Sequence, residues 1–154
     1  MNLVMGVDPG KSGAFAFLDE SGEIVHLEDM PDHTDVSLGT QVAMLLDDVA
    51  PDVVVGAHVE RQSIRPGQRG ASQMMANYGA LLGALGALRV PTVLVTPGAW
   101  KVAAGLRGKD KSASRDLATR CWPSWAESFR RVRDDGRAEA ALIAIYGMEK
   151  NELA

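Results

Sequence analysis

Four carboxylates occupy positions in the sequence from which they could be brought together. Asp8 ends a short apolar run and precedes Pro-Gly, and Glu60 ends a second apolar run that contains three consecutive valines. Asp135 and Glu139 stand four residues apart near the C-terminus, which places them on one face of a helix. If the two runs are neighbouring strands and the helix packs across their ends, the carboxylates converge. Like charges gathered in this way need cations between them, and hard ions such as Mg²⁺ prefer oxygen ligands.

A pair of such ions suits the hydrolysis of a phosphodiester. One ion activates the attacking water and the other stabilises the leaving oxygen. No other constellation competes, since His26, His33 and His58 lack the spacing of metal ligands and Cys121 has no evident base. Each carboxylate alone also has a plainer interpretation, such as capping a turn or a helix. The joint pattern is what indicates a site.

The elements that must position these residues predict an α/β fold. Three short apolar runs near the N-terminus, joined by turn-forming residues, are typical of antiparallel strands. Alternating strand and helix patterns follow, which predicts a mixed sheet with antiparallel hairpin strands first, then parallel strands, and helices on both faces. A length of 154 residues fits a single domain, 1–154. The expected strands are 3–8, 14–18, 24–27, 52–60 and 91–96. The expected helices are 35–49, 72–88, a short helix that starts at 97, a helix that follows residues 109–112 and ends at 121, and 135–148.

The helix expected at 72–88 contains Gly79, Gly83 and Gly86. Glycine weakens a helix, so we expect close packing against another element to compensate. The partner could be the sheet of the same chain or a second copy of the chain.

The charge is unevenly distributed along the chain, whose formal net charge is -4. Residues 1–60 carry one lysine against twelve acidic residues, whereas residues 61–137 carry fourteen basic residues against five acidic ones. A basic stretch of this size suits phosphate binding, with a solvated basic face as the alternative. No apolar run approaches the roughly 18 residues that span a bilayer, so no membrane contact is expected. The start of the chain lacks signal-peptide features and there is one cysteine, which favours a cytoplasmic location.

Several segments, in the same order along the chain, match one family of nucleases. They are residues 6–10 with Ser12 and Gly13, Val59 with Glu60, the helix bearing Gly79, Thr96 and Pro97 leading to Trp100 and Lys101, residues 108–111, and residues 135–142. With this ordered set the chain resembles the RuvC-type Holliday junction resolvases, especially their compact phage-like members. The resemblance covers nearly the whole chain.

The resemblance implies an RNase H-like fold, a homodimer, and paired sites that nick opposed strands of a four-way DNA junction. It implies that Asp8, Glu60, Asp135 and Glu139 bind two Mg²⁺ ions per site, with Mn²⁺ as a possible substitute. Lys111 would lie near the scissile phosphate, with a solvated lysine at a helix start as the plainer alternative. Lys101 would contact the DNA backbone.

Two features depart from the family pattern. Bacterial members carry acids three apart on the last helix, whereas Asp135 and Glu139 are four apart and Gly136 stands between them. Asp134 therefore remains an alternative ligand to Asp135.

The second departure lies in residues 61–70, which lack the aromatic residue that bacterial members place there. This stretch instead predicts a glycine-rich loop that binds phosphate. Strict sequence preference at the cut is accordingly not expected. The residues expected to bind DNA are Lys101, Lys109, Arg61, Arg65 and Arg69.

Three other functions fit parts of the pattern. A general nuclease for forks and flaps would use the same site, and a non-catalytic module could bind junctions without cutting them. A phosphotransferase or ATPase of the actin-like fold also begins with a glycine-rich hairpin bearing an aspartate. Such enzymes usually need two domains, and this length holds one.

Overall fold

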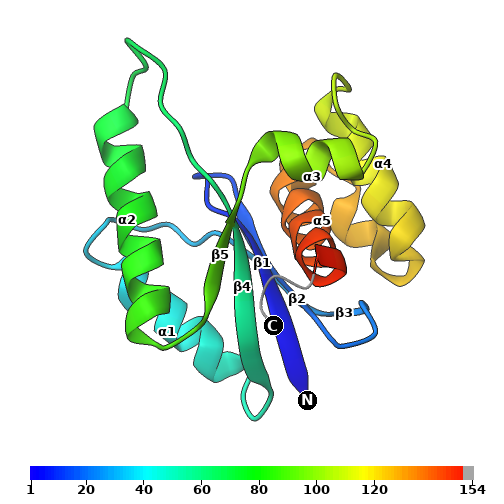
Figure 1. Ribbon diagram of the computed structural model, residues 1–154, viewed down its shortest axis with the longest axis horizontal. Coiled ribbons are helices and arrows are strands. Elements are labelled where there is room, and N and C mark those ends of the chain that lie inside the picture. Colours follow the sequence, from blue (N-terminus) through cyan, green and yellow to red (C-terminus); the bar gives the residue numbers. More distant parts are fainter. Residues whose placement is uncertain (151–154) are drawn as a thin grey trace.

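A mixed β-sheet lies at the centre of the computed structural model, which describes residues 1–150 (Figure 1). Its strands are β1 (Asn2–Asp8), β2 (Ala14–Leu18), β3 (Ile24–Asp29), β4 (Val53–Glu60) and β5 (Thr92–Val95). They lie in the order β3-β2-β1-β4-β5. The first three pair antiparallel, and β4 pairs parallel with both β1 and β5. The predicted sheet, with hairpin strands first and parallel strands later, is confirmed.

Helices cover both faces of this sheet, as predicted (Figure 1). They are α1 (Leu38–Asp48), α2 (Ala71–Ala87), α3 (Pro97–Ala103), α4 (Lys111–Cys121) and α5 (Asp135–Lys150), with the 3₁₀ helices η1 (Pro123–Phe129) and η2 (Val132–Asp134) before α5. α1 and α2 pack on one face and share a core with apolar side chains of β1, β2 and β4. α3, α4 and α5 pack on the other face, over a second core. Pro97 begins α3, where its missing N–H costs nothing.

Small residues of β1 and β2, among them Gly6, Ala14 and Ala16, lie on the face covered by α5, which allows the helix to approach the sheet closely there. Side chains alternate along a strand, so Leu3, Met5 and Val7 point to α1 and α2 while Gly6 points to α5. A Cβ at Gly6 would overlap the backbone of α5. Gly136, in the first turn of α5, lies equally close to the backbone of the β1–β2 turn. These contacts hold the start of α5 over the end of β1.

We predict that Gly6→Ala destabilises the protein severely, because the added methyl group would overlap the carbonyl oxygen of Ala140 and the amide of Ala144. Backbone atoms cannot move aside as a flexible side chain can, so the expected loss is more than about 3 kcal/mol. Gly98→Ala is the matched control, since nothing lies within 4 Å of a Cβ there. It should raise the free energy of unfolding by about 0.5 kcal/mol. Urea unfolding measures both, and equal stabilities would contradict the packing described.

Two elements differ from the sequence prediction. The helix expected from residue 35 begins at Leu38, and Val36 is 87% exposed rather than part of its apolar face. The reason is a turn in which the amide of Thr34 donates to Ser37 Oγ and the amide of Ser37 donates to Thr34 Oγ1. The 3₁₀ helices η1 and η2 were not predicted, since short 3₁₀ segments carry no periodic apolar pattern.

The glycines of α2 do not pack against the sheet. A Cβ at Gly79, Gly83 or Gly86 would meet nothing within 4 Å, so all three face outward. The expectation that close packing within the chain compensates for them is therefore wrong. Tyr78, Leu81 and Leu85 fill the interface of α2 with the core instead.

Within residues 1–150, no helix is long and apolar enough to cross a membrane. The predicted single domain, 1–154, includes residues 151–154, which lie outside the described part of the chain.

Candidate active site

The first two carboxylates lie side by side at the ends of parallel strands. Val7 of β1 pairs in register with Val59 of β4, which makes Asp8 and Glu60 the next residues on neighbouring strands. Residues at matching positions of adjacent strands point to the same face of a sheet. Both carboxylates therefore point to the face covered by α5.

A cavity of about 490 Å³ gathers all four predicted carboxylates. Asp135 and Glu139 enter it from the first two turns of α5, which the glycine contacts hold over the end of β1. The remaining wall comes from the β1–β2 turn, Gln62, the two lysines described next, and Val132 and Arg133 of η2.

Lys101 of α3 and Lys111 of α4 line the same cavity. Lys111 is the first residue of α4, where Asp110 caps the helix by accepting a hydrogen bond from the amide of Ala113. The Nζ of Lys101 lies 5.2 Å from the centre of the Trp100 ring. The cavity thus joins a cluster of acids to two cations, an arrangement suited to cations and phosphate together.

Burial and mutual repulsion both disfavour the charged forms of the acids. Burial raises the pKa of Asp8, opposed by a hydrogen bond from the amide of Gly10 and by Lys111 and Lys101. Burial and the charge of Asp8 also raise the pKa of Glu60, opposed by a hydrogen bond from Trp100. Glu139 shows the largest effect, because burial, Asp8 and Glu60 together raise its pKa to about 7. Carboxylates this reluctant to ionise gain from a cation placed between them.

In EDTA, we expect the free energy of unfolding to fall as the pH rises from about 4.5 to about 7. The pKa of Glu139 rises on folding from 4.5 to about 7, so the folded protein binds a proton that the unfolded chain releases in this pH range. The free energy that this proton contributes to stability is lost as the pH rises through the folded-state pKa. The slope should not exceed about 1.4 kcal/mol per pH unit, and partial solvent exposure should keep it lower.

Glu139→Gln should flatten this dependence and stabilise the metal-free protein at pH 8. Glu149→Gln, on an exposed position of the same helix, is the matched control and should leave the dependence unchanged. Urea unfolding at several pH values measures the effect. A slope unaltered in Glu139→Gln would contradict the assignment of the shift to this residue.

The structure distinguishes Asp135 from Asp134. Asp135 lines the cavity, and its Oδ1 accepts a hydrogen bond of 2.7 Å from Nε of Arg115. Asp134 is almost fully buried and does not line the cavity. Its carboxylate accepts hydrogen bonds from the amide and guanidinium of Arg131, and Arg137 lies 3.9 Å away. Asp134 therefore has a structural role at the start of α5.

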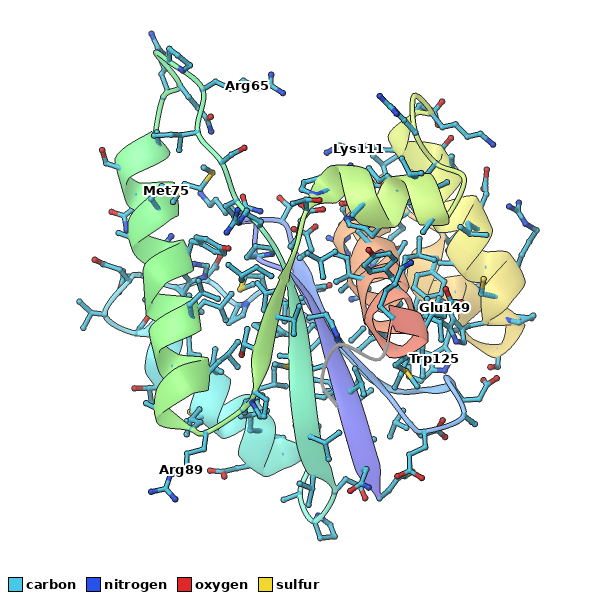
Figure 2. The ribbon with its side chains drawn as sticks, in the orientation of Figure 1. Arg65, Met75, Arg89, Lys111, Trp125 and Glu149 are labelled. Carbon is cyan, nitrogen blue, oxygen red and sulfur yellow. The ribbon has the colours of Figure 1, made fainter. Side chains whose placement is uncertain are left out.

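The other residues predicted to bind DNA lie outside the cavity. Lys109 is exposed in the loop before α4, and Arg61, Arg65 and Arg69 are exposed in the loop 61–70. Figure 2 shows Arg65 on this projecting loop, at the same end of the molecule as Lys111. Gln62 lines the carboxylate cavity, and it also lines a hollow of about 520 Å³ beneath the loop. Arg65 lines this hollow as well. The loop and the cavity are thus contiguous.

The donor chemistry of the cavity fits a hard divalent cation, because all four candidate ligands are carboxylates that line the same cavity. Within residues 1–150, however, no three His, Cys, Asp or Glu side chains are gathered closely enough to hold one ion as they stand. Ion binding would require the side chains to move together.

Sequence reasoning did not assign a role to three residues at this site. Trp100 donates a hydrogen bond to Glu60, Arg115 pairs with Asp135, and Gln62 links the cavity to the loop. Arg115 could have been found, since it stands four residues after Lys111 and so shares its face of α4. The role of Trp100 depends on a contact across forty positions of sequence, which no local pattern reveals.

Comparison by sequence alone finds no matching family model and no matching curated protein. Comparison by structure does find proteins of similar fold. The chain superposes on Thermus thermophilus RuvC in complex with a Holliday junction substrate with a TM-score of 0.73 at 18% identity, covering 97% of this chain and 95% of that one. The chain has the RNase H-like fold of the RuvC resolvases. The predicted fold and the predicted resemblance are both confirmed at this level.

Two further resolvases share the fold. The yeast mitochondrial Holliday junction resolvase Ydc2 matches with a TM-score of 0.62 at 19% identity, covering 97% of this chain and 79% of that one. Fowlpox virus resolvase, solved with substrate Holliday junction DNA, matches with a TM-score of 0.61 at 14% identity, covering 97% of this chain and 99% of that one.

Proposed function

We propose that this protein is a metal-dependent endodeoxyribonuclease that resolves four-way DNA junctions by hydrolysing phosphodiesters in opposed strands. The observation that carries the proposal is the cavity in which four carboxylates from β1, β4 and α5 meet Lys101 and Lys111. Support also comes from the fold, because the similar structures from Thermus thermophilus and fowlpox virus contain Holliday junction DNA. The predicted cytoplasmic location stays a prediction.

In the proposed reaction, each part of the cavity has a separate task. Asp8, Glu60 and Glu139, with Asp135 as a fourth ligand, would hold two Mg²⁺ ions, or Mn²⁺ in their place. When bound, such ions supply an activated water and charge stabilisation at the leaving oxygen. Lys111 and Lys101, which line the same cavity, would contact the phosphate and offset its charge. Arg115 holds Asp135 at the cavity and would release it as a cation binds.

The substrate would be held outside the cavity by the exposed basic residues already described. Arg61, Arg65 and Arg69 on one side and Lys109 on the other would bind DNA backbones on either side of the cut. All four residues are expected to contact phosphate, and phosphate contacts carry no sequence information. We therefore expect weak sequence preference.

A homodimer would provide the two sites needed for paired nicks. The outward-facing glycines of α2 support this arrangement, because they leave a smooth helix surface on which a second copy could pack closely. Sedimentation of the purified protein, alone and with junction DNA, would measure the stoichiometry. A monomer on the junction would contradict the homodimer.

The decisive experiment is cleavage of a labelled synthetic four-way junction in Mg²⁺ and in EDTA. Linear duplex, a three-way fork and an RNA–DNA hybrid serve as control substrates. Paired, Mg²⁺-dependent nicks at the junction would support the resolvase.

Other outcomes would favour the alternatives. Equal cleavage of forks and junctions would favour a general debranching nuclease. Binding of the junction with no cleavage would favour a non-catalytic module. Cleavage in EDTA would contradict the metal-dependent reaction.

A further inference from the structure

Glu60 is anchored by an aromatic side chain of the core. Its Oε2 accepts a hydrogen bond of 2.7 Å from the indole Nε1 of Trp100, and the whole contact is buried. The indole ring is fully buried in the core beneath α3 and α5. A packed ring has almost no rotational freedom, so its single N–H can hold the carboxylate in one place. By contrast, Asp8 receives only a 3.1 Å hydrogen bond from the amide of its own turn.

The same indole also positions a cation of the cavity. Lys101 follows Trp100 in α3, and its Nζ lies 5.2 Å from the centre of the ring, within the range of a cation–π contact. Trp100 thus contacts an acid through its ring edge and a base through its ring face. One rigid side chain sets the relative placement of both.

This contact has an electrostatic consequence for Glu60. Burial and the charge of Asp8 raise the pKa of Glu60, and the hydrogen bond from Trp100 opposes them. Indole donates but cannot accept, so the bond favours the ionised carboxylate.

We infer that Trp100 is a positioning residue that holds the Glu60 carboxylate in the place from which it would bind a divalent cation. The inference rests on the proposed function for its substrate, but the metal site itself can be tested without DNA. The alternative is that Trp100 only fills the core.

Trp122 provides a matched control for that alternative. It is also buried, 3% exposed, in the same core, and its Nε1 donates a 2.9 Å hydrogen bond to the carbonyl oxygen of Gly22, which is not part of the cavity. Trp100→Phe and Trp122→Phe therefore remove the same group from equivalent packing environments. Only the first removes a donor to a proposed ligand.

The test compares Mn²⁺ binding to the two folded variants by titration calorimetry, with urea unfolding in EDTA as the measure of stability. Both variants should lose stability. We expect Trp100→Phe alone to weaken Mn²⁺ binding about tenfold, which corresponds to about 1.4 kcal/mol. In cleavage assays, Trp100→Phe should raise the Mg²⁺ concentration needed for half-maximal rate by a larger factor than the factor by which it lowers the rate at saturating Mg²⁺. Equal Mn²⁺ affinities in the two variants would overturn the inference.

A second measurement uses the wild-type protein and does not depend on whether Trp100→Phe folds. The indole N–H signals of the three tryptophans can be followed by ¹H–¹⁵N NMR as Mg²⁺ is added, with Trp122→Phe and Trp125→Phe used for assignment. The Trp100 signal should shift while the Trp122 signal stays in place. A Trp100 signal insensitive to Mg²⁺ would overturn the inference.

The inference and the proposed function can fail separately. If the wild type cuts no junction but the Trp100 signal shifts and Mn²⁺ binding depends on this residue, the inference stands and the nuclease does not. If junctions are cut and both tryptophan variants bind Mn²⁺ equally, the nuclease stands and the inference does not.

Discussion

Asp8→Asn is expected to abolish cleavage of a four-way junction while leaving junction binding intact. Asparagine has the shape of aspartate but lacks the negative charge with which Asp8 would bind a cation. The rate should fall on the order of a thousandfold, about 4 kcal/mol of activation free energy. Glu60→Gln should behave in the same way.

Binding should survive because the residues proposed to hold DNA lie elsewhere. Arg61, Arg65 and Lys109 are exposed on loops outside the cavity, and neither substitution alters them. Removing a buried negative charge should also make the metal-free protein slightly more stable, because burial raises the pKa of Asp8. A loss of activity could then not be attributed to unfolding.

Asp47→Asn is the matched control, since Asp47 is an exposed acid on α1, a helix on the other face of the sheet. It should cut and bind as the wild type does. Gel-shift titration in Ca²⁺ and cleavage in Mg²⁺ measure the two properties separately. Parallel loss of binding and cleavage in Asp8→Asn would refute the assignment of Asp8 to catalysis.

The placement of Asp8 and Glu60 could be predicted from sequence because it depends on local signals. An apolar run, a charged residue at its end and a turn immediately afterwards specify a strand terminus without knowledge of the rest of the fold. The structure then pairs Val7 with Val59, which makes the two acids neighbours. Their convergence with Glu139 depended on two further conditions, that the strands are neighbours and that the last helix crosses their ends, and local signals do not supply these.

The choice between Asp134 and Asp135 could not be made in the same way. The two residues are adjacent, and either could follow from the spacing on α5. The outcome depends on η2, where Arg131 binds the carboxylate of Asp134 and turns it away from the cavity. A three-residue 3₁₀ helix stabilised by one ion pair has no periodic signature in sequence.

The direction in which the α2 glycines point could not be predicted from the sequence either. Their spacing indicated that something packs closely on the helix, but a spacing pattern cannot say on which side the core lies. Tyr78 and Leu85 determine the buried face, and Gly79 and Gly83 therefore point outward. Only the tertiary structure separates these faces.

Replacing Arg61, Arg65 and Arg69 together by Ala is expected to weaken junction binding by roughly a hundredfold, because each arginine that binds a phosphate should contribute about 1 kcal/mol. The loop that carries them lies next to the cavity, so the contacts that are lost should be those with the DNA segment that leads into the site. The rate of cleavage at saturating protein should change far less, because none of the three lines the carboxylate cavity.

The salt dependence distinguishes phosphate binding from general damage to the loop. Each arginine that neutralises a phosphate should account for about 0.9 of the slope of log affinity against log salt concentration, so the triple variant should have a slope smaller by about 2.7. Arg89→Gln is the matched control, because Arg89 lies at the opposite end of α2 from this loop (Figure 2). It should leave both the affinity and the slope unchanged. A triple variant with weaker binding but an unaltered slope would mean that the arginines act on the shape of the loop and do not bind phosphate.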